Sequence, residues 1–85
     1  MATRREVIDP DAALAIIDKV RDDSARVLEE CRSRIDRRLA ELPPDASPTE
    51  EFRIRLEETD RARAELDRIH DDSIVAIRAV MFPLQ

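Results

Sequence analysis

The chain of 85 residues contains no glycine, tryptophan or tyrosine, and its only two aromatic residues are phenylalanines. The absence of glycine excludes a glycine-rich phosphate loop of the usual form, because such a loop needs backbone positions without a Cβ atom. The scarcity of aromatic residues argues against a β-sheet domain. Instead, 42% hydrophobic and 41% charged residues favour long amphipathic helices.

Cysteine and histidine occur once each, as Cys31 and His70. One thiol forms no disulfide within the chain, and no apolar stretch of the signal-peptide type follows Arg4 and Arg5. We therefore expect a reducing, cytoplasmic location. No apolar run approaches the roughly 18 residues of a membrane span, so no membrane partner is expected.

Basic residues are also fewer than acidic ones: the chain has 15 basic and 20 acidic residues, and its net charge is -5. Binding to a phosphate backbone requires clustered cations, so nucleic acid is not an expected partner. The sequence has no Ser-His-Asp order, Cys-His pairing or zinc-ligand spacing. We expect no enzymatic activity and no cofactor, and no motif resembles that of a known family.

The sequence does contain two long amphipathic segments, and the first follows the triplet Asp-Pro-Asp at 9–11. This triplet predicts a helix start, because Asp accepts hydrogen bonds from unpaired amides and Pro10 lacks a donor where none is needed. We expect the helix over 10–42, ended by the prolines at 43–44. An apolar stripe with an eleven-residue repeat, about 3.67 residues per turn, predicts a nearly straight helix with Cys31 as a small core residue. The predicted inward stripe comprises Ile17, Val20, Ser24, Leu28, Cys31, Ile35, Leu39 and Leu42.

The tetrapeptide Ser-Pro-Thr-Glu at 47–50 predicts the second helix. It is typical of a capping box, in which the serine hydroxyl and the glutamate carboxylate each accept from the other residue's backbone amide. We expect a helix over 48–82, and the loop 43–47 has a length typical of an antiparallel αα-hairpin. The prediction is therefore a single all-α domain, 1–85, of two long antiparallel helices. The second inward stripe comprises Phe52, Leu56, Thr59, Ala62, Leu66, Ile69, Ser73, Ile77 and Val80.

Opposite charges recur at helical spacing along both predicted helices, as in Glu30 to Arg34 and Glu57 to Arg61. Such pairs add only about 0.2–0.5 kcal/mol each to helix stability. We interpret them as solvated helix faces and not as binding sites.

The open end of the predicted hairpin is apolar on all sides, because residues 12–17 and 74–77 meet there. A helix that is apolar all round needs neighbours on every side. We therefore expect the hairpin to pair into a four-helix bundle or coiled-coil oligomer, as a homodimer or with another protein. The predicted function is a protein-protein interaction module that serves as an adaptor, assembly or regulatory factor. The predicted interface comprises Leu14, Ile16, Ile17, Ile74, Ile77, Val80, Met81 and Phe82.

Two alternative functions stay open. Asp67 and His70 lie three residues apart on one helix face, and Asp23 and Asp71 are expected nearby in the hairpin. Carboxylates and an imidazole from facing helices are a ligand set for a metal ion or a small polar ligand. The other alternative is an antitoxin-like or anti-factor regulator that binds one protein partner.

The segments 20–24 and 69–73 resemble each other, since both read apolar, charged or polar, Asp, Asp, Ser. One interpretation is a pseudo-symmetric polar site built from both helices. The other is chance similarity between two amphipathic segments of low sequence diversity.

Overall fold

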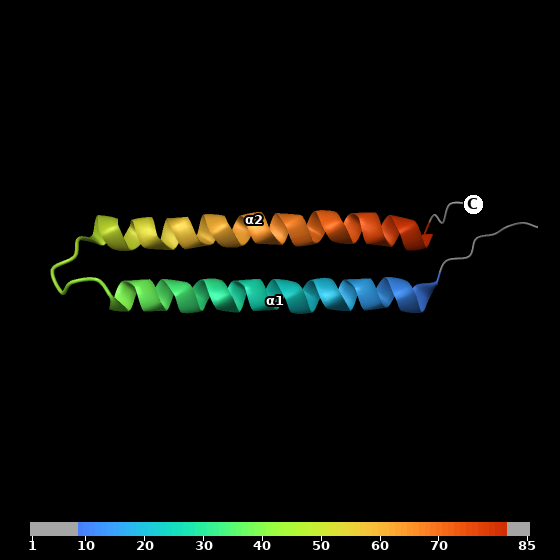
Figure 1. Ribbon diagram of the computed structural model, residues 1–85, viewed down its shortest axis with the longest axis horizontal. Coiled ribbons are helices and arrows are strands. Elements are labelled where there is room, and N and C mark those ends of the chain that lie inside the picture. Colours follow the sequence, from blue (N-terminus) through green and yellow to red (C-terminus); the bar gives the residue numbers. More distant parts are fainter. Residues whose placement is uncertain (1–8, 82–85) are drawn as a thin grey trace, which may run out of the picture.

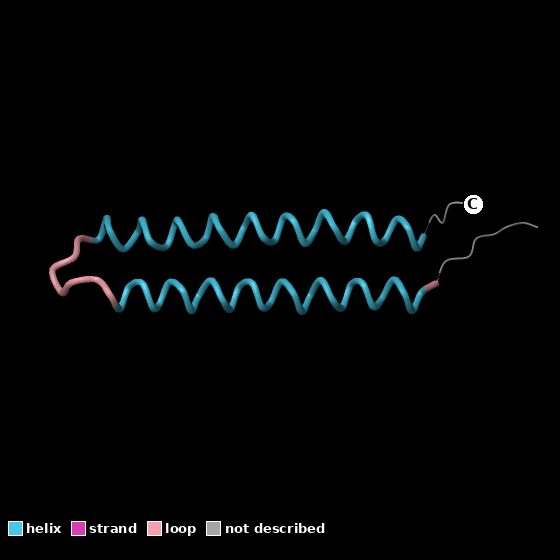
Figure 2. Tube along the Cα trace, in the orientation of Figure 1, coloured by secondary structure: helices cyan, strands magenta, loops and turns pink. Residues whose placement is uncertain are grey.

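Two helices form nearly all of the structure. The computed structural model describes residues 9–81, and in that part of the chain α1 spans Pro10–Ala40, α2 spans Pro48–Met81, and no strand occurs. The two helices lie side by side and run in opposite directions (Figure 1). A short loop joins them at one end, as the tube in Figure 2 shows. The predicted all-α antiparallel hairpin is confirmed.

The first helix begins where the Asp-Pro-Asp triplet predicts. Asp9 is the N-cap residue, and its Oδ1 accepts from the backbone N–H groups of Asp11 at 3.1 Å and Ala12 at 3.2 Å. Two of the amides that have no partner within the helix are thereby satisfied. Pro10 occupies the first helical position, where its missing N–H costs no hydrogen bond.

The first helix ends at Ala40, two residues before the predicted end at Leu42. The Leu42 N–H donates to the carbonyl oxygen of Leu39 at 3.2 Å, a tight turn with i to i+3 spacing in place of a further α-helical turn. The proline at 43 disfavours helical geometry in the residue before it, which explains the early end. The predicted end of the second helix at Phe82 lies outside the described residues.

The second helix begins with the predicted capping box. The Glu50 N–H donates to Ser47 Oγ at 3.2 Å, and the Ser47 N–H donates to Glu50 Oε1 at 3.3 Å. These two bonds satisfy amides that the first turn leaves without helical partners.

Replacing Ser47 by Ala is expected to lower the free energy of unfolding by about 1 kcal/mol, because the Glu50 amide loses its side-chain acceptor. Denaturant unfolding followed by circular dichroism measures this change. Thr49→Ala, an exposed position in the same turn, is the matched control. Equal losses in the two variants would contradict a capping role for Ser47.

The core between the helices is thin. Val27, Cys31 and Ala62 form its centre, with Ile35, Leu66 and Ile69 packed against them, and no side chain within residues 9–81 is completely buried. The buried residues, between 3% and 8% exposed, are Val27, Cys31, Ile54, Glu58 and Ala62. Cys31 is thus a small core residue, as its place on the predicted stripe indicates.

The eleven-residue repeat of α1 is present, and Val20, Cys31 and Ile35 of the predicted stripe do face α2, but at two positions the residue before the predicted one faces inward. Ile16 lines a hollow between the helices and Val27 is buried, whereas Ile17 and Leu28, predicted to face inward, are 48% and 55% exposed. One residue is a rotation of about 100° around a helix. The predicted stripe was centred on the most apolar side of α1. That side is turned partly toward α2 and partly toward the solvent.

The prediction for the beginning of α2 was wrong for the same reason. Ile54 and Glu58 face α1 and are buried, whereas Phe52, Leu56 and Thr59 are exposed. The apolar side of each helix is therefore wider than the contact between the two helices.

Candidate protein-association surface

Large apolar side chains remain exposed along both helices. Leu28, near the middle of α1, and Phe52, in the first turns of α2, are 55% and 65% exposed. Burying such side chains releases about 1.5–3 kcal/mol each, so leaving several of them in water is unfavourable. The exposed set within residues 9–81 is Leu14, Ile17, Leu28, Phe52, Leu56, Val75 and Met81.

On α1 the exposed residues lie in one row. Ile17 and Leu28 are eleven residues apart, which is about three helical turns, and Leu14 lies one turn before Ile17. Ile17 and Leu28 each follow directly after a residue that faces α2, Ile16 or Val27. The exposed row is therefore rotated by about 100° from the contact with α2.

On α2 a matching row is present. Met81 directly follows the half-buried Val80, so it is rotated from the contact with α1 in the same sense along the chain. Phe52 lies about eight turns before Met81 and shares its side of the helix, and Leu56 is one turn after Phe52. Val75, between these positions, lies on a different side.

Both rows lie on the same face of the hairpin. In two antiparallel helices, a rotation in the same sense along each chain leads to the same side of the pair. We call this surface the apolar face, and it extends from the open end of the hairpin to the loop. Its residues are Leu14, Ile17, Leu28, Phe52, Leu56 and Met81.

The predicted interface covers only part of this surface. Of the predicted residues, Leu14, Ile17 and Met81 are exposed on the apolar face. Phe82 lies outside the described residues. The remaining four, Ile16, Ile74, Ile77 and Val80, are half-buried near the open end.

Sequence reasoning missed Leu28, Phe52 and Leu56 as surface residues, because it assigned them to the inward stripes. A signal was present in the spacing of α1. Ile16 and Val27 are eleven residues apart and form a second apolar row directly beside Ile17 and Leu28. Two adjacent apolar rows on one helix indicate two apolar neighbours, as in a four-helix bundle.

A buried carboxylate crosses the contact between the helices. Glu58 is 6% exposed. Its Oε1 accepts from Arg34 Nε at 2.8 Å, and its Oε2 accepts from Arg38 Nη1 at 2.9 Å. The hydrogen bond from Arg34, followed by that from Arg38, lowers the pKa of Glu58 although burial opposes this shift.

The charges around Glu58 pair mainly between the helices, although Arg61 Nη1 of the same helix also lies 4.0 Å from Glu58 Oε1. The predicted partner of Arg34 was Glu30, but Arg34 binds Glu58 and lies 3.8 Å from Glu65. Arg38 Nη2 also contacts Glu57 Oε1 at 3.0 Å. The interpretation of Arg34 as part of a solvated face was therefore wrong. The four-residue spacing of Arg34 and Arg38 places both on one side of α1, but it does not identify Glu58 as the group that they bind.

The Glu58 cluster predicts a dependence of stability on pH. The pKa of Glu58 lies below its ordinary 4.5 in the folded chain, so its contribution is complete above that value and is lost as the pH falls through the folded pKa. The pKa of Asp23 is lowered as well, first by the hydrogen bond from Lys19. We expect the free energy of unfolding to decrease below about pH 4.5.

Denaturant unfolding at stepped pH measures this dependence. Glu58→Gln removes one shifted carboxylate, so its stability should decrease less steeply in acid than that of the unmodified chain. Glu57→Gln, which alters a half-exposed neighbour, should retain the original slope. An unchanged acid slope in Glu58→Gln would show that the cluster does not control the response.

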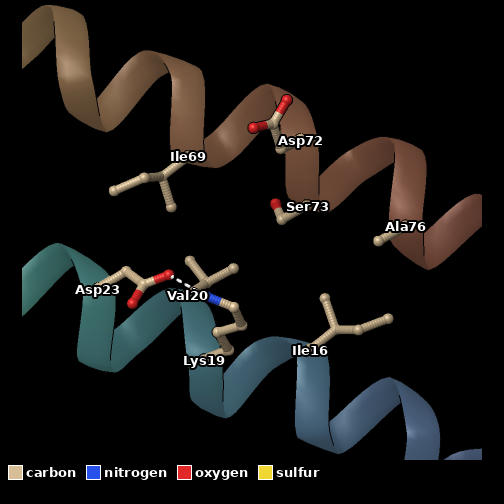
Figure 3. A pocket seen from close by; sticks show the side chains of 8 residues that line it. All are labelled: Ile16, Lys19, Val20, Asp23, Ile69, Asp72, Ser73 and Ala76. Atoms are coloured by element: carbon tan, nitrogen blue, oxygen red, sulfur yellow. Dashed lines mark hydrogen bonds and ion pairs between the residues drawn. The ribbon is translucent and has the colours of Figure 1, made fainter.

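A hollow of about 240 Å³ lies between the helices toward the open end. Figure 3 shows Ile16, Val20 and Ile69 beside the small side chains of Ser73 and Ala76. The hollow arises where these two small residues of α2 meet α1. The remaining lining residues are Lys19, Asp23 and Asp72.

The two similar segments, 20–24 and 69–73, both contribute to this hollow. Three of its polar side chains, those of Lys19, Asp23 and Ser73, already have partners in the chain. Asp23 Oδ2 accepts from Lys19 Nζ at 2.7 Å, the dashed line in Figure 3, and Ser73 Oγ donates to the carbonyl oxygen of His70 at 2.7 Å. The segments meet, but their polar side chains mainly bond within their own helices.

The four residues of the possible metal site are not gathered together. Asp23 is paired with Lys19, and it lines the hollow with residues 69, 72 and 73, whereas Asp67, His70 and Asp71 do not line it. His70 Nδ1 lies 4.0 Å from Asp71 Oδ1, and both side chains are exposed. Within residues 9–81 no three His, Cys, Asp or Glu side chains are arranged to hold a metal ion.

No family model, curated protein or solved structure matches this chain. Neither of the two described helices is both long and apolar enough to cross a lipid bilayer.

Proposed function

We propose that this protein is a non-enzymatic protein-association module that pairs with a second copy through its apolar face and so forms a four-helix bundle. The observation that carries this proposal is the placement of six large exposed apolar side chains on one face of the hairpin. In such a bundle each helix contacts two neighbours at about right angles around its axis. The two apolar rows of α1, rotated by about 100°, match this requirement.

The thin core supports the same proposal. No side chain within residues 9–81 is completely buried, and only four apolar residues there are more than nine-tenths buried. A second layer of helices would cover Ile35 and Leu39, which are half-buried in the single hairpin. The added burial would stabilise helices whose mutual contact alone is small.

The predicted interface at the open end becomes one part of a longer contact. Leu14, Ile17 and Met81 occupy this end of the apolar face, and Leu28 extends it toward the loop. A dimer that buries this face is suited to an adaptor, assembly or regulatory role, because it holds two identical chains in a defined arrangement.

Light scattering on the purified chain tests this proposal. The expected mass at micromolar concentration is twice the 9.8 kDa of one chain. A monomer that remains helical at these concentrations would overturn self-pairing. A stoichiometric complex with one foreign protein, recovered with a monomeric chain, would support the regulator alternative instead.

A further inference from the structure

We propose that the second copy docks on the apolar face in the same direction, so that both loops lie at one end of the bundle and α1 of each copy lies against α2 of the other. This inference rests on the proposed self-pairing and adds its orientation. The contacts that select the orientation are Arg21 and Arg32 of one copy with Asp71 and Asp60 of the other.

The two arginines lie at the outer border of the apolar face on α1, and Arg21 also forms an exposed ion pair with Asp18 of its own helix. Arg21 follows Ile17 by four residues, and Arg32 follows Leu28 by four residues. Positions four apart are neighbours on a helix surface. Because the two arginines are eleven residues apart, about three turns, they occupy equivalent places along the border.

The two aspartates occupy the corresponding border on α2. Asp60 follows Leu56 by four residues, and Asp71 is eleven residues beyond Asp60. Arg63 lies within one turn of both Asp60 and Asp67, so it has acidic neighbours on its own helix. Between Arg53 and Arg78, which lie two turns outside them on the same side of α2, the two aspartates have the spacing of the two basic positions on α1.

The register of the hairpin places opposite charges at the same level along its axis. Cys31 Sγ lies 3.4 Å from the carbonyl oxygen of Glu58, so Arg32 is level with residues close to Asp60. Near the open end, residues 20 and 23 line the hollow with residues 69, 72 and 73. Arg21 is therefore level with Asp71.

A second hairpin covers the apolar face in one of two directions. In the same direction, α1 lies against α2 of the second copy, and each arginine faces an aspartate. In the reverse direction with full overlap, α1 lies against α1 and α2 against α2, so Arg21 faces Arg32 and Asp60 faces Asp71. Like charges along an interface disfavour the reverse arrangement, whereas complementary charges favour the parallel one.

Exchange of the charges tests the orientation. In the same-direction dimer, Arg32→Asp alone and Asp60→Arg alone each place like charges together, and each should raise the dissociation constant about tenfold. An equimolar mixture of the two variants should pair with near-original affinity, because both contacts then join opposite charges. In the reverse dimer each single variant would pair more tightly than the unmodified chain, which would overturn the inference.

Energy transfer between labelled chains gives an independent readout. The labels are placed in a Cys31→Ala chain that light scattering shows to keep the mass of a dimer. A dye at Asp45→Cys marks the loop, and a dye at Asp11→Cys marks the open end. We expect strong transfer between two loop labels, and weak transfer between a loop and an open end, which are separated by about 50 Å at 1.5 Å per residue. The opposite pattern would overturn the orientation but leave self-pairing standing, whereas a monomeric unmodified chain would overturn both.

Discussion

Replacing Leu28 by Asp is expected to raise the dissociation constant of the proposed dimer by about 100-fold or more. Leu28 is 55% exposed in the single hairpin, and it lies near the middle of the apolar face. In the paired state the new carboxylate of each copy would be removed from water, with no positively charged group placed to pair with it. The hairpin should remain helical at concentrations where the variant is monomeric.

Sedimentation equilibrium over a range of protein concentrations measures this effect. Val75→Asp is the matched control, because Val75 is even more exposed, at 68%, and lies away from the apolar face. It should leave the dissociation constant close to its original value. Equal effects of the two substitutions would show that the apolar face has no special role in pairing.

Replacing Glu58 by Ala is expected to lower the free energy of unfolding by about 2 kcal/mol. The substitution removes the acceptor of hydrogen bonds from Arg34 and Arg38, and it leaves two neighbouring positive charges without the carboxylate that they share. Loss of one member of a fully buried ion pair costs about 3–5 kcal/mol. The smaller figure applies here because the Arg38 side chain is 40% exposed, so water reaches the cluster.

Denaturant unfolding at constant protein concentration measures this change, since the proposed pairing would also contribute to apparent stability. Glu57→Ala is the matched control, because Glu57 contacts Arg38 at 3.0 Å from a half-exposed position. Its loss should be clearly smaller. The double variant Arg34→Ala with Glu58→Ala should lose less than the sum of the single losses, because both act on the same bond. Additive losses would contradict the proposed coupling.

The ends of the helices were predictable from the sequence because they depend on local contacts. The capping box at 47–50 and the N-cap at Asp9 join groups within three residues of each other. Such contacts form in nearly the same way whatever the helix later packs against. The eleven-residue repeat of α1 is also local, and its period is present in the structure.

The residues that the prediction misplaced depend on contacts between the helices. Ile17, Leu28 and Phe52 were expected to face inward, because apolar spacing shows where a helix is apolar and not which neighbour covers it. Likewise, the bond between Arg34 and Glu58 joins residues 24 positions apart. No spacing rule within one helix predicts such a pair.

The sequence by itself therefore determined two capped amphipathic helices, the loop between them and the excess of apolar surface over what one hairpin contact can bury. The tertiary structure decided which row of each helix faces the other, the burial of Glu58 between two arginines, and which residues of the two helices lie level along the hairpin axis. The physical reason is how far apart along the chain the interacting residues lie. Helix formation is settled among neighbours along the chain, whereas rotation and register are settled by side-chain packing between segments that the loop brings together.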